Sequence, residues 1–429
     1  SITFVKFLSN LGFVSTDDGQ VMKIIHSNNS IYPVQRWEHL HDYVTTFLMK
    51  TDEQHFELGE KFEVKDDDGE SWEQDDVLDH WINKGQGLCK LVFSTKKMLP
   101  NFRMSQIFRD TDKECFMNFR NGIVRITKDK IEMMSDTSVI KNKYRFTSQF
   151  IDKLDTHKNS GWNGKVEVND SIDGEFEMFI KSSTSIKVDE LKKYEPEEPR
   201  YGKEYVYNEE GYKSLMCGIG YLLHGKSMGG ISKMVLFQDR YIDGVTRQGG
   251  NGKSIVLRGI ERVVKLYESE GIKIDTKSQF KYQGINLGDR VFFIDELRPE
   301  SGPVKGGIQI HDLFTDITGS FKVEKKNQNE LTLSGDDVPK LVGCSNYIVF
   351  DKDDSSSMRR LHIVEFSDLG KHHVGNINRG WNSDKKMLGM EGHWTQKDWN
   401  DFFNFMFRCV QVWLQSKPEF YTEENPRWK

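Results

Sequence analysis

The hydrophobic positions of this chain change their spacing along its length. One early stripe recurs every three or four residues and comprises Trp37, Leu40, Tyr43, Val44, Phe47 and Leu48, a pattern that predicts one face of a helix. Residues 119–127 alternate instead, and 131–133 resume the alternation after a polar turn, which predicts a β-hairpin. A charged stretch with two prolines and no periodicity predicts a linker at about 188–202. We therefore expect an N-terminal region of mixed α+β structure over 1–200.

Short apolar runs alternate with helical patterns from about 203 to 368. The strands we expect are 233–237, 291–295, 340–344 and 361–366, an order that predicts an α/β core with a mainly parallel sheet. Ligands of such sheets bind at the carboxyl ends of the strands.

A C-terminal helical segment is expected over 369–429. Thr395 and Asp398 form a capping box, and Pro418 is expected to end the helix. Its apolar stripe predicts core packing and comprises Trp399, Phe402, Phe403, Met406, Phe407, Val410, Trp413 and Leu414.

Composition narrows the class of protein. The chain has 429 residues, enough for two or three domains. A net charge of −6 argues against a protein that coats nucleic acid with its whole surface, so any such contact must be local. No apolar run long enough to span a membrane and no signal-peptide pattern are seen, so we expect a cytoplasmic protein. The five scattered cysteines are expected to be buried thiols. The chain begins with serine, which leaves open both methionine removal and a fragment of a longer polypeptide.

A glycine-rich loop precedes a helix-like run that begins at Ile255. The loop ends in Gly249-Gly250-Asn251-Gly252-Lys253-Ser254. Backbone N–H groups of such a loop and a helix N-terminus bind phosphates, the lysine reaches the terminal phosphates, and the serine hydroxyl ligates Mg²⁺. The sequence therefore predicts a site for ATP and Mg²⁺.

An upstream segment, Gly220–Ser227, fits the stricter G-x-x-x-x-G-K-S pattern, whereas the later loop has Arg247 in place of the first glycine. The variable positions of the upstream segment are Tyr221, Leu222, Leu223 and His224, which continue an apolar helical pattern. Because that backbone cannot wrap a phosphate, we favour the later loop.

Two carboxylates, Asp295 and Glu296, follow the apolar strand at 291–295. After a phosphate loop, Asp295 is suited to hold Mg²⁺ and Glu296 to orient the attacking water; a simple polar turn is the alternative. Asn346 ends the next strand and could bond the γ-phosphate or the water, although asparagine is also an ordinary turn residue. Arg359 and Arg360 precede the last strand, and guanidinium suits charge that develops on a transferring phosphoryl group.

A hairpin is predicted over 319–333, with Lys325 and Lys326 near its tip. A solvated lysine pair is the ordinary interpretation. A basic hairpin inserted into an ATP site is also where hydrolysis could be coupled to a polyanion, which would make both lysines DNA-binding.

The order of these elements resembles the superfamily 3 helicases, and within them the phage and poxvirus-type primase-helicases. The resemblance is strongest over 230–366 and weaker over 105–230. It implies an AAA+-like P-loop NTPase that forms hexameric rings, binds ATP between subunits, translocates on single-stranded DNA, and is often fused to or associated with a primase or polymerase. It also implies that Asn346 is a sensor and that Arg360, supported by Arg359, reaches the γ-phosphate of a neighbouring subunit. The long loop before Gly252 leaves the roles of Arg240 and Arg247 open.

Three functions remain open at this point. The favoured one is an ATP-dependent replicative DNA helicase of phage or mobile-element type. The alternative is an ATP-switched DNA-binding or assembly module without unwinding activity. A P-loop small-molecule kinase ranks lowest, because it needs neither the hairpin nor the late arginine pair.

Overall fold

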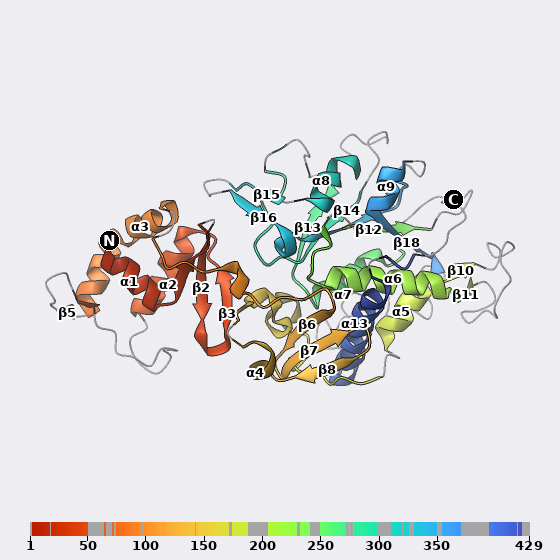
Figure 1. Ribbon diagram of the computed structural model, residues 1–429, viewed down its shortest axis with the longest axis horizontal. Coiled ribbons are helices and arrows are strands. Elements are labelled where there is room, and N and C mark those ends of the chain that lie inside the picture. The colour runs from red at the N-terminus through yellow and green to blue at the C-terminus, as the bar shows by residue number, and fades with distance from the viewer. Residues whose placement is uncertain are drawn as a thin grey trace. The chain divides into compact units, whose positions relative to one another are not determined.

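The structure, a computed structural model, describes residues 2–17, 19–49, 64–65, 71–72, 74–95, 98–141, 143–170, 174–187, 205–229, 232–240, 249–271, 274, 278, 280–297, 310–319, 321–325, 330–349, 354–369, 394–417 and 419–422. The predicted linker at 188–202 lies outside these residues. Two compact units are present (Figure 1). The first comprises Ser1–Phe108, Ile140–Thr147 and Lys326–Leu331, and the second Arg109–Val139, Ser148–Lys325 and Thr332–Lys429.

The first unit is a small α+β fold. Its sheet has the order β1 (Phe13–Ser15), β2 (Val21–Ile25), β3 (Ser30–Pro33), β9 (Arg145–Phe146). The helices are α1 (Ile2–Asn10), α2 (Trp37–Met49) and α3 (Gln74–Ser94), and β4 (Val64–Lys65) pairs with β5 (Ser71–Trp72). The helix predicted from the early stripe is α2, and its Leu40, Val44 and Leu48 are buried. The indole of Trp81 on α3 donates a hydrogen bond to Thr45 of α2 at 2.7 Å.

The second unit begins with an antiparallel sheet of β6 (Glu114–Phe119), β7 (Gly122–Thr127) and β8 (Ile131–Met134), followed by α4 (Asp136–Val139). The predicted hairpin is β7 and β8; the sequence pattern did not separate β6. Gly122, the first residue of β7, follows the turn from β6 and has a φ of 147°. A Cβ there would lie 2.7 Å from the carbonyl oxygen of Met134, so the position requires glycine.

The main sheet consists of β12 (Met234–Asp239), β13 (Leu266–Glu270), β14 (Val291–Asp295), β17 (Lys340–Ser345) and β18 (Leu361–Phe366). The order is β13-β14-β17-β12-β18, and every pairing is parallel. This confirms the parallel sheet and four of its strands. The fifth strand, β13, was missed because it is an edge strand whose acidic side chains are exposed. All five carboxyl ends lie on one edge of the sheet, with β12 between β17 and β18.

Helices complete the second unit: α5 (Glu175–Ser183), α6 (Glu209–Leu223), α7 (Lys253–Glu261), α8 (Phe314–Thr318), α9 (Ser355–Arg360) and α13 (Gln396–Ser416). Short pairs are formed by β10 (Ile186–Lys187) with β11 (Tyr205–Val206), and by β15 (Phe321–Val323) with β16 (Leu331–Leu333). The Thr395–Asp398 capping box opens α13 as predicted, and all eight residues of its apolar stripe are buried. The five cysteines are buried free thiols. Within the described ranges, no helix combines the length and apolarity needed to cross a membrane.

The helices α6 and α13 pack closely against each other (Figure 1). At the contact, a Cβ on Gly220 would lie 2.0 Å from the carbonyl oxygen of Cys409 on α13. The indole of Trp413 on α13 donates to Nδ1 of His224, which follows α6, at 3.3 Å. Glycine at position 220 therefore sets how closely the two helices approach.

We predict that Gly220→Ala lowers the free energy of unfolding by about 1–3 kcal/mol, because the added methyl group overpacks the α6–α13 contact. The control is Gly87→Ala in α3, where a Cβ would meet nothing within 4 Å. That change should be neutral or stabilise by up to about 1 kcal/mol, the ordinary helix preference for alanine. Chemical denaturation followed by circular dichroism measures both. Parental stability of Gly220→Ala would show that the helices are not in this close contact.

Candidate nucleotide site

A buried lysine lies at the carboxyl edge of the main sheet. Lys253, the first residue of α7, is 7% exposed, and its Nζ forms an ion pair with Asp239 at the end of β12. The same Nζ donates to Oδ1 of Asn346, directly after β17, at 2.8 Å. Asp239 is itself only 3% exposed. A buried ammonium requires such partners, because an unpaired buried charge costs several kcal/mol.

The loop before Lys253 is built from glycines in the left-handed region. The φ angles of Gly249, Gly250 and Gly252 are 66°, 76° and 91°. A Cβ on Gly252 would lie 2.6 Å from Cζ of Phe179 on α5, and one on Gly249 would lie 3.1 Å from Nδ2 of Asn346. Both the backbone conformation and the packing therefore favour glycine.

On the same edge, Asp295 ends β14 and Glu296 follows it. Glu296 is exposed, has a φ of 51°, and donates its backbone N–H to Oδ1 of Asp295 at 2.9 Å. Burial raises the pKa of Asp295, and the nearby charges of Glu268 and Glu296 act in the same direction. The Glu296 N–H and the Lys253 charge oppose this shift. The strand β17 lies between β14 and β12, so Asp295 and Asp239 flank the strand that carries Asn346.

These residues fit a phosphate group. Lys253 has three N–H donors, of which Asp239 and Asn346 take two, so one remains for a phosphate oxygen. Oδ1 of Asn251 and Oδ2 of Asp239 are buried without a hydrogen-bond partner, but both are acceptors, so they suit a donor or a cation and do not themselves bind phosphate. Left-handed glycines at the start of a helix also present backbone N–H groups to anions.

The residues also fit Mg²⁺ held jointly with phosphate. Ser254 is exposed in the first turn of α7, and Asp295 supplies a carboxylate. No group of three or more histidine, cysteine or acidic side chains in the described part of the chain forms a complete metal cage. Mg²⁺ is usually held by one or two carboxylates together with substrate phosphates.

The two predicted arginines lie elsewhere. Arg359 and Arg360 end α9 and precede the first residue of β18, so they lie at the amino end of that strand, away from the carboxyl edge. Arg360 is half-buried, donates to the carbonyl oxygen of Ser356 at 3.1 Å, and lies 4.7 Å from the ring centre of Phe314. Arg359 is exposed. The structure therefore does not bring either arginine to Lys253.

Arg240 and Lys325 each make a hydrogen bond away from Lys253. The Arg240 N–H donates to the carbonyl oxygen of Phe366 at 2.9 Å, whereas Arg247 lies outside the described residues. Lys325 donates to the side chain of Asn286. Lys326 also lies outside the described residues, and Lys322, in the middle of β15, is exposed.

The segment 220–227, which fits the stricter sequence pattern, does not form a phosphate-binding loop. Residues 220–223 form the last turn of α6, in agreement with the helical pattern, and the next residues bind carboxylates of the same chain. The Gly225 N–H donates to Asp110 at 2.6 Å and the Ser227 N–H to Asp336 at 2.8 Å. Lys226 pairs with Asp336 at 3.2 Å. The donors of this segment are thus used internally.

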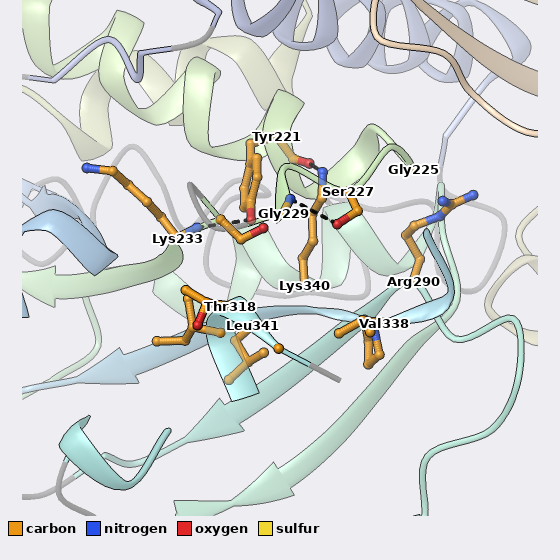
Figure 2. Close-up of a pocket in the computed structure, with 14 residues that line it drawn as sticks. Tyr221, Gly225, Ser227, Gly229, Lys233, Arg290, Thr318, Val338, Lys340 and Leu341 are labelled. Carbon is orange, nitrogen blue, oxygen red and sulfur yellow. Dashed lines mark hydrogen bonds between the residues drawn. The ribbon is translucent and has the colours of Figure 1, made fainter. Parts of the chain in front are cut away.

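A pocket beside that segment is lined by three basic side chains, Lys233, Arg290 and Lys340, which do not point toward a common centre (Figure 2). Lys340 is buried and donates to the carbonyl oxygens of Tyr221 and His224 at 2.6 and 2.5 Å. Burial and the nearby charge of Arg290 lower the pKa of Lys340. Lys233 and Arg290 extend away from each other in Figure 2. We therefore assign this pocket to packing at the end of α6.

Two residues of the candidate site were missed in the sequence. Asp239 had a usable signal, because it ends an apolar strand just as Asp295 does. Phe179 had none, since its contact with the loop is made through folding of a distant helix.

Comparisons with known proteins give only remote likeness. No family model and no curated protein matches the chain. Among solved structures, the apo NrS-1 C-terminal region is 10% identical with a TM-score of 0.40, covering 97% of this chain and 69% of that one. A second apo form of that region is 10% identical with a TM-score of 0.32, covering 70% and 65%. A JCV helicase structure is 14% identical with a TM-score of 0.28, covering 42% and 52%. At these TM-scores the similarities do not support any assignment of function to this chain.

Proposed function

We propose that this chain binds ATP with Mg²⁺ and hydrolyses it. The observation that carries the proposal is the contact between Lys253 of the glycine loop and Asn346 of the neighbouring strand, 2.8 Å apart at the carboxyl edge of a parallel sheet. A loop, a lysine and a polar amide that meet at this edge are suited to hold and sense a terminal phosphate.

The division of roles follows from position. Gly249, Gly250, Asn251 and Gly252 wrap the phosphates, and Lys253 donates to them. Ser254 and Asp295 hold Mg²⁺, which when bound neutralises phosphate charge. Glu296 is exposed beyond the end of β14, where an acceptor can orient an attacking water molecule.

We further propose that hydrolysis is coupled to movement on single-stranded DNA, as in an AAA+-like replicative helicase that acts as a hexameric ring. Arg359 and Arg360 lie away from Lys253, so in this proposal they act toward a neighbouring subunit, and the exposed Arg359 is the more accessible of the two. The hairpin of β15 and β16 would supply the DNA contact through Lys322 and Lys326. An ATP-switched assembly module without unwinding activity remains the alternative. As part of the helicase proposal, we expect the chain to be fused to or associated with a primase or polymerase.

Lys253→Ala should weaken ATP binding by about a hundredfold or more and abolish hydrolysis, because charge-assisted hydrogen bonds to phosphate contribute about 1.5–3 kcal/mol each and the buried Asp239 would lose its partner. The matched control is Lys226→Ala, which removes the lysine of the stricter sequence match. It should leave ATP binding unchanged. Isothermal titration and phosphate release measure both. Loss of ATP binding in Lys226→Ala, with Lys253→Ala unaffected, would move the site to the other segment.

The helicase proposal predicts that Lys322→Ala and Lys326→Ala each weaken the dependence of single-strand binding on salt. The slope of the logarithm of the binding constant against the logarithm of the salt concentration should become shallower by roughly 0.7, because each lysine that contacts a phosphate releases counterions. Both should slow unwinding of a forked duplex while DNA-free ATPase activity persists. Lys325→Ala is measured beside them, because the side chain of Lys325 donates a hydrogen bond to Asn286. Lys128→Ala, an exposed lysine at another hairpin turn, is the control. Normal unwinding by Lys322→Ala and Lys326→Ala would show that the hairpin is not the DNA contact, whereas a parent protein that binds ATP but unwinds no duplex would favour the assembly module.

A further inference from the structure

We propose that Asp239 is a third carboxylate of the nucleotide site and that it makes ATP binding depend on Mg²⁺. This inference rests on the proposed ATP site. Asp239 differs from Asp295 and Glu296 in its location, because it ends the strand that leads into the glycine loop and contacts Lys253 directly.

The charges of the site are unbalanced toward acid. Among the described residues assigned to the site, the Lys253 ammonium stands against the carboxylates of Asp239, Asp295 and Glu296. The Lys253–Asp239 pair is buried on both sides, with side-chain exposures of 8% and 4%, so water screens it little. The positive charge that a phosphate loop offers to an anion is therefore already neutralised within the protein.

The pair does not block the lysine, however. Asp239 and Asn346 occupy two of its three donors and fix the direction of the third. A phosphate oxygen at that third donor would lie close to the Asp239 carboxylate, whose Oδ2 is buried and has no partner. Lys253 can therefore bind phosphate while it stays paired, but the phosphate meets the repulsion of Asp239.

That repulsion selects between two forms of the nucleotide. Coulomb energy scales with the charge of the ligand, and free ATP carries about four negative charges whereas its magnesium complex carries about two. Asp239 should therefore oppose free ATP about twice as strongly, on a logarithmic scale, as it opposes the magnesium complex. A carboxylate in this position makes the site accept the nucleotide in its metal-bound form.

A purely structural pair would behave differently. If Asp239 only held Lys253 in place, Asp239→Asn would weaken the attraction of the lysine for the phosphates, and free ATP, with its larger charge, would lose more binding than the magnesium complex. The ratio of the dissociation constants without and with Mg²⁺ separates the two roles, since loss of the Asp239 repulsion lowers this ratio and loss of the lysine attraction raises it.

The experiment measures ATP binding by titration calorimetry, once with excess Mg²⁺ and once with EDTA. Compared are the parent, Asp239→Asn and Asp336→Asn, where Asp336 is the partner of the lysine in the stricter sequence match. Inorganic triphosphate serves as a second ligand, to show that the effect arises at the phosphates. Asp239→Ser is measured in the same way if circular dichroism shows that the asparagine variant is unfolded.

We expect the parent to bind ATP far more weakly in EDTA, and Asp239→Asn to lower the EDTA-to-Mg²⁺ ratio by about tenfold or more. Asp336→Asn should keep the parental ratio. A parental or raised ratio in the Asp239 variant would overturn the inference and leave the ATP site standing. If the parent itself does not bind ATP in Mg²⁺, the proposed function fails, and this inference with it.

Discussion

The ion pair between Lys253 and Asp239 is the contact on which the candidate site depends. An ammonium that is 7% exposed is tolerated only with close acceptors, and these come from two neighbouring strands, Asp239 from β12 and Asn346 from the end of β17. The parallel register pairs Gln238 with Ser345, so the residues that follow them, Asp239 and Asn346, lie next to each other. The glycine loop must then bring Lys253 back to this point, which its left-handed residues allow.

Two segments that come earlier in the sequence than the loop support this arrangement. Phe179 of α5 packs directly against Gly252, so the shape of the loop depends on a helix more than 70 residues upstream. At the other end of the sheet, Asp110 accepts from Gly225, and Arg109 pairs with Asp337 at 2.8 Å. These contacts join the segment that leads into β6 to the elements around the sheet. Residues 109–139 and the chain from Ser148 to the loop therefore form part of the same compact unit as the site.

The sequence predicted what depends on local periodicity. Four strands of the parallel sheet, α2, α13 and the helical character of residues 220–223 follow from the spacing of apolar side chains. The edge strand β13 was missed because its exposed Glu268 and Glu270 leave no apolar run. Tertiary contacts were beyond reach: the bond from Lys325 to Asn286, the carboxylates that occupy Gly225 and Ser227, and the pairing of Asp239 with Lys253 each join residues that no sequence spacing relates.

The central claim is that phosphate binds at the loop of Gly249–Ser254 and not at Gly225–Ser227. Hydrogen–deuterium exchange with and without Mg²⁺ and a non-hydrolysable ATP analogue tests it most directly, because bound phosphate protects the amides that it accepts from. Peptides that cover 249–256 should exchange more slowly with the nucleotide, while those covering 224–229 should exchange at the same rate in both states. Protection confined to 224–229, or no protection in either segment, would contradict this account.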